Sequence, residues 1–407
     1  MKIKILKGTN QIGGCITEIE SLKGTKILID FGKDLNTKKN KIPAINWSEY
    51  KAVCITHSHE DHIGLINEIP DYVDVYIEEI SLEIYKILLE FTKGSINRAI
   101  KTFKIGDSLN IEDISVESYI VDHSAFNSVM YLIKCDGKKL LHTGDFRDNG
   151  YKGGLLPSTV KKIKKVDIII MEGTTLSRDT TKKNIKEFEL YNHILETCRE
   201  YKRVLILQSS TNIDRITTMY KAVRDSNKIF VEDVFTANIT TLLASKGFNI
   251  PNPKTFEDVY SFTPANRSEY KKEEKSEFYN KHIEPFKDKE AHNLLMHKPY
   301  GLLIKSSMTL DLEIYSNKNR LKDTCLIYSM WDGYKEDLGN FFSKIENMGI
   351  KVITHHTSGH SDEYARDIIL NGIEYNYLIP IHTTEKQKFD KYEKSFILED
   401  NEILEVK

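Results

Sequence analysis

Apolar residues in the first part of the chain come in short runs separated by glycine turns. Residues 1–6 alternate charged with apolar side chains, and further apolar runs cover 15–19 and 26–31. Short runs bounded by glycine are typical of β-strands. The stretch 52–55 is short enough for a buried strand, and a cluster of histidines follows it directly. We therefore predict a sheet whose fourth strand, at 52–55, leads directly into a cluster of polar residues that could bind a ligand.

The pattern changes twice after the histidine cluster. A helix is predicted at 63–69, and the segments that follow are a strand at 73–77, a helix at 81–91 and strands at 114–120, 128–134 and 138–141. From 166 onward strands alternate with helices. The predicted strands there are 166–171, 204–207, 229–232, 302–305, 324–329 and 352–354, with helices at 214–224 and 235–244 and a loop with an exposed helix over about 252–290. Alternation of this kind indicates sheets covered by helices on both faces.

Length and composition restrict the class of protein. A chain of 407 residues is long enough for two or three domains, and no linker separates them, so a second domain is expected to be inserted into the first. With 40% hydrophobic and 29% charged residues the chain is typical of a soluble protein, and no apolar run approaches the roughly 20 residues of a membrane span. Five scattered cysteines predict reduced thiols and a cytoplasmic location. The net charge of −2 means that any phosphate-binding surface must be local.

The run from His57 to His62 carries the clearest chemistry. His57 and His59 are two residues apart, so on an extended chain both imidazoles point the same way. Asp61 and His62 follow at the start of the predicted helix. Two histidines on one side and an Asp–His pair on the other suit two divalent ions, with imidazole favouring zinc and the carboxylates leaving manganese open. A polar surface loop is the alternative, but the position directly after a buried strand argues against it.

Three more candidate ligands each follow an apolar run: His123, Asp145 and His382. Polar residues at strand ends can meet at a shared rim of a sheet. A single histidine in such a place is more often a structural residue that is held by a hydrogen bond. The combination of all three with the histidine cluster is what indicates a metal site.

These residues together resemble a known family. The HxHxDH run with His123, Asp145 and His382 is similar to the metallo-β-lactamase fold. Residues 171–175, 356–360 and 379–382 resemble motifs A, B and C of its β-CASP branch, whose members are nucleases, and the ribonuclease J type is the nearest in pattern. The resemblance implies an α/β protein, a metallo-β-lactamase αββα sandwich with an inserted β-CASP α/β cap domain. It would place the catalytic domain at 1–176 and 349–407 and the cap domain at 177–348.

The resemblance also implies roles for single residues. The first metal is expected on His57, His59 and His123. The second is expected on Asp61, His62 and His382, with Asp145 bridging. A hydroxide held between two divalent ions, Zn²⁺ or alternatively Mn²⁺, would then attack a phosphodiester.

Six further roles are predicted around this centre. Asp61 is expected to orient the hydroxide, and His360 to give a proton to the leaving oxygen. Glu172 is expected to form a hydrogen bond to His360. The substrate-binding candidates are His356, Ser358 and Gly359. For Ser358 and Gly359 the alternative is a plain helix N-cap turn before Asp362.

The predicted function is cleavage of RNA. A DNA-directed nuclease of the same branch and a small-molecule ester or thioester hydrolase on the same fold are the alternatives; a catalytically inactive scaffold is disfavoured because all seven ligands are present. The chain departs from the ribonuclease J pattern after His382, where Thr383 and Thr384 stand in place of Gly. It also ends at Lys407, so the family's additional C-terminal domain, which supports dimer assembly, is not expected, although a homodimer stays open.

Two residues outside the motifs are placed by their type. Trp331 is expected in the core or between domains, with stacking on a nucleic-acid base as the alternative. Arg215 is expected to form a surface ion pair, with a phosphate contact as the alternative.

Overall fold

The structure, a computed structural model, describes residues 1–35, 42–178, 183–263, 276–306 and 321–406. The chain forms two compact units. Unit 1 comprises 1–89, 93–184 and 359–407, and unit 2 comprises 90–92 and 185–358. Unit 2 is therefore inserted within the chain of unit 1. Its main segment begins eight residues after, and ends ten residues after, the borders that the sequence predicts for the cap domain.

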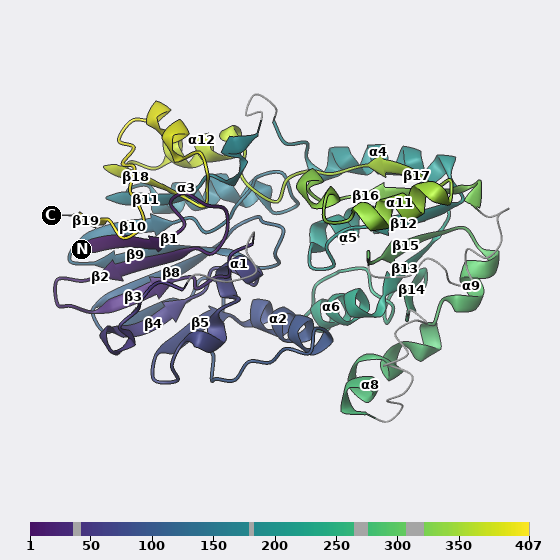
Figure 1. Ribbon diagram of the computed structural model, residues 1–407, viewed down its shortest axis with the longest axis horizontal. Helices are drawn as coiled ribbons and strands as arrows, with labels where there is room; N and C mark the ends of the chain where they lie inside the picture. Colours follow the sequence, from purple (N-terminus) through teal and green to yellow (C-terminus); the bar gives the residue numbers. More distant parts are fainter. Residues whose placement is uncertain (36–41, 179–182, 264–275, 307–320, 407) are drawn as a thin grey trace. The chain divides into compact units, whose positions relative to one another are not determined.

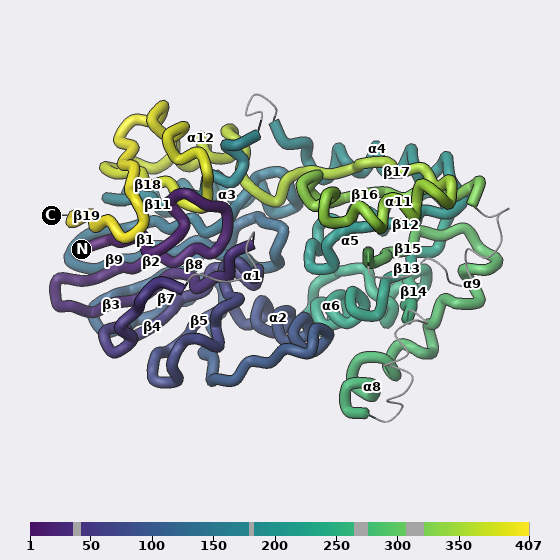
Figure 2. Tube along the Cα trace, in the orientation of Figure 1, coloured from purple at the N-terminus to yellow at the C-terminus, as the bar shows by residue number. Residues whose placement is uncertain are grey.

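The first sheet of unit 1 has seven strands in the order β19-β1-β2-β3-β4-β5-β6. The strands are β1 (Lys2–Lys7), β2 (Ile16–Glu20), β3 (Lys26–Ile29), β4 (Tyr50–Cys54), β5 (Asp74–Glu78), β6 (Lys101–Phe103) and β19 (Ile403–Glu405). Strand β1 pairs antiparallel with both β2 and β19, so the first and last strands of the chain lie side by side (Figure 2). Strands β3, β4 and β5 are parallel, and their carboxyl ends share one edge.

The second sheet of unit 1 has six strands in the order β18-β11-β10-β9-β8-β7. They are β7 (Ser108–Ile111), β8 (Ile114–Ile120), β9 (Val129–Cys135), β10 (Lys138–His142), β11 (Ile168–Glu172) and β18 (Tyr377–Ile381). Strands β10, β11 and β18 are parallel. Their carboxyl ends therefore deliver Asp145, Glu172 and His382 to one edge of the sheet.

Unit 1 has four layers (Figure 1). The inner faces of the two sheets share a core to which Ile29 of β3 and Ile170 of β11 both belong. Helix α2 (Glu79–Phe91) covers the first sheet through Tyr85, and α3 (Leu156–Ile163) and α12 (Glu363–Gly372) cover the second through Val160 and Ile369. The remaining helices are α1 (Glu60–Ile63), η1 (Trp47–Glu49), η2 (Ile66–Glu68), η3 (Gly153–Leu155), η4 (Thr174–Ser177) and η7 (Lys386–Lys391). The predicted αββα sandwich is confirmed.

Unit 2 is built on one parallel sheet with the strand order β14-β13-β15-β12-β16-β17. The strands are β12 (Arg203–Leu207), β13 (Ile229–Asp233), β14 (Val259–Phe262), β15 (Tyr300–Ile304), β16 (Thr324–Tyr328) and β17 (Lys351–Thr354). The described helices are α4 (Glu187–Glu200), α5 (Ile213–Asp225), α6 (Val234–Ser245), α8 (Glu277–His282), η5 (Glu284–Lys289), α9 (His292–His297), η6 (Asp332–Lys335) and α11 (Gly339–Asn347). Helices α9 and α11 cover one face through Leu295 and Ile345. Helix α5 packs on the other face, where Gly301 leaves room for Val223.

Several segments differ from their sequence predictions. The helix expected at 63–69 is replaced by the end of α1 at Ile63 and the single turn η2, and β6, β7 and β19 were not predicted. The stretch 252–290 was expected to be a loop followed by an exposed helix, but it contains the buried strand β14 and the helices α8 and η5. Residues 264–275 of this stretch lie outside the described residues. Strand β14 has only four residues, and among the described strands it pairs only with β13, so its hydrophobic pattern is too short to be recognised in the sequence. Within the described segments, no helix combines the length and the apolar surface that crossing a bilayer requires.

Arg215 is buried, so the expectation of a surface pair is wrong. Its Nη2 lies 2.9 Å from Oε1 of Glu187 and its Nε lies 3.1 Å from Oε2, and both side chains are inaccessible to solvent. Nη2 also donates to the Thr357 carbonyl at 3.2 Å. The pair therefore joins α4, α5 and the segment after β17 inside unit 2.

Removal of Glu187 is expected to destabilise unit 2 strongly. Glu187→Ala leaves the Arg215 guanidinium buried without its counter-ion, which costs about 3–5 kcal/mol of unfolding free energy. Asp225→Ala is the matched control, because it removes the partner of the neighbouring exposed Arg224 and should change the free energy by less than about 1 kcal/mol. Urea unfolding of both variants measures the difference. Equal losses would contradict the assignment of a structural role to the buried pair.

Candidate metal centre

All seven predicted metal ligands lie in unit 1, and five of them follow strands. His57 and His59 follow β4, and His123 follows β8 in the neighbouring sheet. Asp145 follows β10 and His382 follows β18. The chain turns into α1 directly after His59, which brings Asp61 and His62 to the same rim. The structure therefore brings together residues that are up to 325 positions apart, and all but His59 are buried.

The first group of ligands consists of three imidazoles. His59 Nδ1 lies 3.2 Å from His57 Nε2 and 3.1 Å from His123 Nε2. Burial lowers the pKa of His57 and of His123 well below the ordinary value, and it lowers the pKa of His59 to about 4. The three rings are thus neutral near pH 7. Neutral imidazole is the form that binds a metal ion.

The second group combines a carboxylate with two imidazoles. Asp61 Oδ2 lies 3.2 Å from His382 Nε2 and 3.8 Å from His62 Nε2. Burial works to lower the pKa of His62, but the carboxylates of Asp145, Asp30 and Asp61 raise this pKa well above its usual range. The site therefore carries an excess of negative charge that a divalent cation would neutralise.

Asp145 lies between the two groups. Its Oδ2 is 3.2 Å from His62 Nε2 and 3.8 Å from the Nε2 atoms of His57, His123 and His382. Among the described residues, neither Asp145 Oδ2 nor His62 Nε2 has a hydrogen-bond partner, although both atoms are buried. Buried polar atoms normally have partners, so two orphans facing each other indicate a site for an ion. The donor set fits two divalent ions with one carboxylate between them.

Residues that the sequence reasoning missed hold the rings in place. Asp30 Oδ2 lies 2.7 Å from His62 Nδ1, and the same carboxylate accepts hydrogen bonds from the backbone N–H and the hydroxyl of Thr56. Thr174 Oγ1 lies 2.7 Å from His382 Nδ1. In each case the Nδ1 atom is engaged and Nε2 is left for the metal, as partners behind metal ligands usually arrange. Asp30 directly follows the apolar strand β3, so its position at a strand end could have marked it in the sequence, as it marked Asp145 and His382.

Glu172 does not form the predicted hydrogen bond to His360. Its Oε1 accepts the backbone N–H of Ser361 at 2.8 Å and its Oε2 accepts that of Thr174 at 2.9 Å. His360 Nδ1 is 3.8 Å from Oε1, which is too long for a hydrogen bond. The carboxylate is thus taken up by backbone amides, and it fixes the segment on which His360 stands. His360 Nδ1 is also 3.5 Å from Asp145 Oδ2, and its side chain is 22% exposed, so a substrate can reach it.

The predicted substrate-binding residues fall on both sides of a unit border. Gly359 belongs to unit 1, and its carbonyl lies 2.5 Å from His123 Nδ1. A Cβ atom at Gly359 would lie 2.6 Å from Ser124 Oγ, so close packing explains the glycine. Asp362 caps α12 by accepting the Ala365 N–H at 2.9 Å. His356 and Ser358 belong to unit 2, and their contact with substrate stays a prediction.

Comparison with known proteins identifies the part of the chain that carries most of these ligands. Residues 16–157 match the model of the metallo-beta-lactamase superfamily. This segment includes His57, His123 and Asp145 together with the Asp61–His62 pair. It is a metallo-β-lactamase domain. The predicted recognition of this fold is therefore confirmed.

Similar proteins extend the comparison beyond this domain. An RNase J-like protein of Methanocaldococcus jannaschii is 29% identical over 222 residues, which cover 50% of each chain. The Ribonuclease J of Sinorhizobium meliloti is 34% identical over 99 residues, which cover 24% of this chain and 18% of the relative. The chain thus spans half the length or less of these relatives. A crystal structure of a protein of unknown function from Enterococcus faecalis V583 has 19% identity, covers 99% of both chains and gives a TM-score of 0.78, which shows a shared fold across both units.

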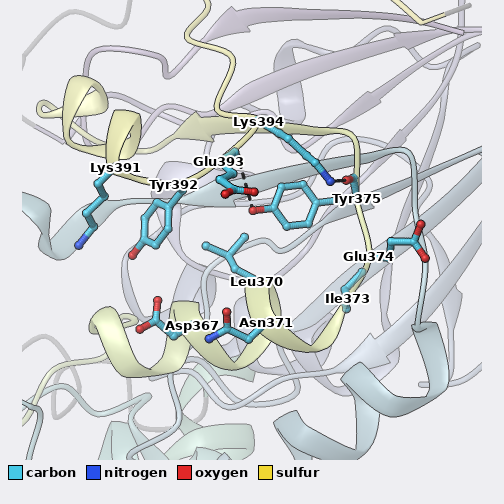
Figure 3. A pocket seen from close by; sticks show the side chains of 10 residues that line it. All are labelled: Asp367, Leu370, Asn371, Ile373, Glu374, Tyr375, Lys391, Tyr392, Glu393 and Lys394. Atoms are coloured by element: carbon cyan, nitrogen blue, oxygen red, sulfur yellow. Dashed lines mark hydrogen bonds between the residues drawn. The ribbon is translucent and has the colours of Figure 1, made fainter.

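A cavity of about 290 Å³ lies elsewhere in unit 1, between α12 and the segment after η7 (Figure 3). Leu370 and Tyr375 face it from the region of α12, and Tyr392 faces it from the opposite segment. None of the residues that line it is a ligand candidate. The remaining lining residues are Asp367, Asn371, Ile373, Glu374, Lys391, Glu393 and Lys394. The cavity is therefore distinct from the metal centre of the metallo-β-lactamase domain.

Replacement of Asp30 by asparagine is expected to weaken metal binding about 10- to 100-fold, because His62 loses the carboxylate that orients its ring. Titration of the apoprotein with zinc in the presence of a competing chelator measures the affinity. Asp113→Asn is the matched control, since Asp113 also accepts a hydrogen bond from a threonine, Thr25, but lies far from any ligand candidate. An affinity for zinc that is the same in both variants would show that Asp30 does not support the ligand.

Proposed function

We propose that the chain is a two-metal phosphodiesterase that hydrolyses RNA. The position of Asp145 between two groups of ligands is the observation that carries this proposal, because two ions held there would be close enough to clamp the attacking and leaving oxygens of an in-line displacement at phosphorus. The similarity to a Ribonuclease J and to an RNase J-like protein supports RNA as the substrate. All five cysteines are buried and free of disulfides, which is compatible with the cytoplasm as the place of action.

The family resemblance implies how the ligands would divide between the two ions. His57, His59 and His123 would hold one ion, Asp61, His62 and His382 would hold the other, and Asp145 would contact both. We favour zinc because five of the seven ligands are imidazoles, and manganese is the alternative. Two divalent ions bound there would neutralise charge on the attacked phosphate and would make water acidic enough to react near neutral pH.

The protein's own residues supply the rest of the reaction. Asp61 orients the attacking water and accepts its proton. As the new P–O bond forms, the bond from phosphorus to the leaving ribose oxygen breaks, and that oxygen needs a proton. His360 is partly exposed beside Asp145, so it is placed to donate this proton. Glu172 keeps the Ser361 amide in place and thereby positions His360.

Cleavage of end-labelled oligonucleotides tests this function. Single-stranded RNA and DNA of the same sequence are incubated with zinc- or manganese-loaded protein, and the RNA is supplied with a 5′ monophosphate, triphosphate or hydroxyl. We expect RNA to be cut by the wild type and left intact by Asp61→Ala. Hydrolysis of small esters or thioesters by a metal-loaded protein that cuts neither nucleic acid would reject the proposal.

A further inference from the structure

Unit 2 exposes two large aromatic side chains next to each other. Trp331 and Tyr334 are 46% and 47% exposed, and their rings meet edge to face with centroids 5.4 Å apart. Both follow β16: Trp331 directly precedes η6 and Tyr334 lies within it. The expectation of a core position for Trp331 is therefore wrong. Trp and Tyr are enriched at surfaces that bind partners.

The Trp331 ring is held against the backbone. A Cβ atom at Gly333 would lie 2.3–2.6 Å from three atoms of the indole, so only glycine lets the ring lie there. The Trp331 carbonyl accepts a hydrogen bond from the Tyr328 hydroxyl at 2.6 Å and from the Tyr334 N–H at 3.1 Å. The backbone that carries the ring is thus held by hydrogen bonds and the ring packs against Gly333, which lowers the entropy cost of binding a ligand there.

The pair lies at the carboxyl edge of the parallel sheet of unit 2. In open sheets of this kind ligands bind at the carboxyl ends of the strands. Strands β16 and β12 are neighbours, with Tyr328 opposite Leu207, so the loop that carries Ser209 and Ser210 emerges beside the aromatic pair. Lys305 follows β15 at the same edge and donates to Ser210. Lys305 also lies 3.7 Å from Asp233 Oδ2, and a lysine with neighbouring hydroxyls can contact a phosphate.

From these observations we propose that Trp331 and Tyr334 form a base-stacking platform for single-stranded RNA. The inference rests on the proposed function for the identity of the nucleic acid. Aromatic rings bind unpaired bases through their π faces, while nearby lysines and hydroxyls contact the backbone. The overall charge of −2 leaves such local surfaces as the means of holding RNA.

Intrinsic fluorescence tests the platform directly because the chain has only two tryptophans. The other, Trp47, packs in unit 1 against Phe31 and Tyr50, with ring centroids 5.2 and 5.9 Å away. Trp47→Phe therefore makes Trp331 the sole tryptophan, and Asp61→Ala in the same chain keeps the RNA uncut. We expect a short single-stranded RNA to quench this emission saturably. An RNA duplex of the same sequence and inorganic polyphosphate should leave it unchanged, since neither offers unpaired bases.

Affinity for labelled RNA supplies the second readout. Trp331→Ala should weaken binding about 5- to 150-fold, as loss of one stacked base predicts. Phe188→Ala is the matched control, because Phe188 is 63% exposed in the same unit but stands at the start of α4, and it should bind RNA like the wild type.

Three results would overturn the platform. The first is equal RNA affinity of the Trp331→Ala and Phe188→Ala variants, and the second is quenching by polyphosphate equal to that by single-stranded RNA. The third is an emission that changes with protein concentration in the absence of RNA, which would show that a second copy covers this surface. Quenching by single-stranded RNA in a protein whose wild type cuts no RNA would keep the platform and reject the proposed hydrolysis. The two hypotheses therefore fail separately.

Discussion

Replacement of Asp145 by asparagine is expected to lower kcat for RNA cleavage by roughly 10³-fold or more and to leave fewer than two divalent ions on each chain. Asparagine has nearly the same shape but no charge. Asp145 Oδ2 faces the Nε2 atoms of four histidines at 3.2 to 3.8 Å, so the loss of charge affects both groups of ligands at once. Steady-state kinetics and metal analysis of the same preparation measure the two effects.

Asp167→Asn is the matched control for this variant. Asp167 lies at the opposite end of β11 in the same sheet and accepts the Lys139 N–H at 2.9 Å, which asparagine can also do. It should keep both the wild-type kcat and the full metal content. An Asp145→Asn protein with two ions and nearly unchanged kcat would remove Asp145 from the centre of the mechanism.

Replacement of His360 by glutamine is expected to lower kcat by about 10²- to 10⁴-fold while both ions stay bound. His360 stands beside Asp145 but belongs to the more exposed part of the site. It can also form a group of possible ligands with His123 and Asp145, so the metal content of the variant decides between a proton donor and a ligand. A loss of one ion would make His360 a ligand instead.

His355→Gln is the control for this second variant. His355 belongs to the same segment of the sequence, but its Nε2 lies 2.8 Å from the Thr197 hydroxyl within unit 2. It should cut RNA at the wild-type rate. A similar fall in kcat for both variants would show that the segment as a whole, rather than the imidazole of His360, matters for catalysis.

Much of the fold could be predicted from local patterns. Strand β8 covers the predicted residues, β12 begins one residue earlier than predicted, and α5 is one residue longer at each end. These elements were predictable because their hydrophobic patterns are long or strongly apolar. Strand β14 was not predicted because it is short and lies at an edge. Strand β19 also has only three residues, and its pairing with β1 depends on a contact between the two ends of the chain.

The candidate site was predictable where spacing alone brings ligands together. His57, His59 and His62 lie within six residues of sequence, and Asp145 and His382 follow apolar strands. The supporting contacts could not be predicted, because Thr174 reaches His382 across 208 residues of sequence. The pairing of Arg215 was misjudged for the same reason, since its partner lies on another helix.

The number of divalent ions on the purified chain tests the central claim most directly. Elemental analysis of the wild type after loading with zinc and removal of loosely bound metal should give two ions per chain. The two groups of three ligand candidates on either side of Asp145 fit one ion each. One ion per chain, or none, would contradict the two-metal centre and the mechanism that depends on it.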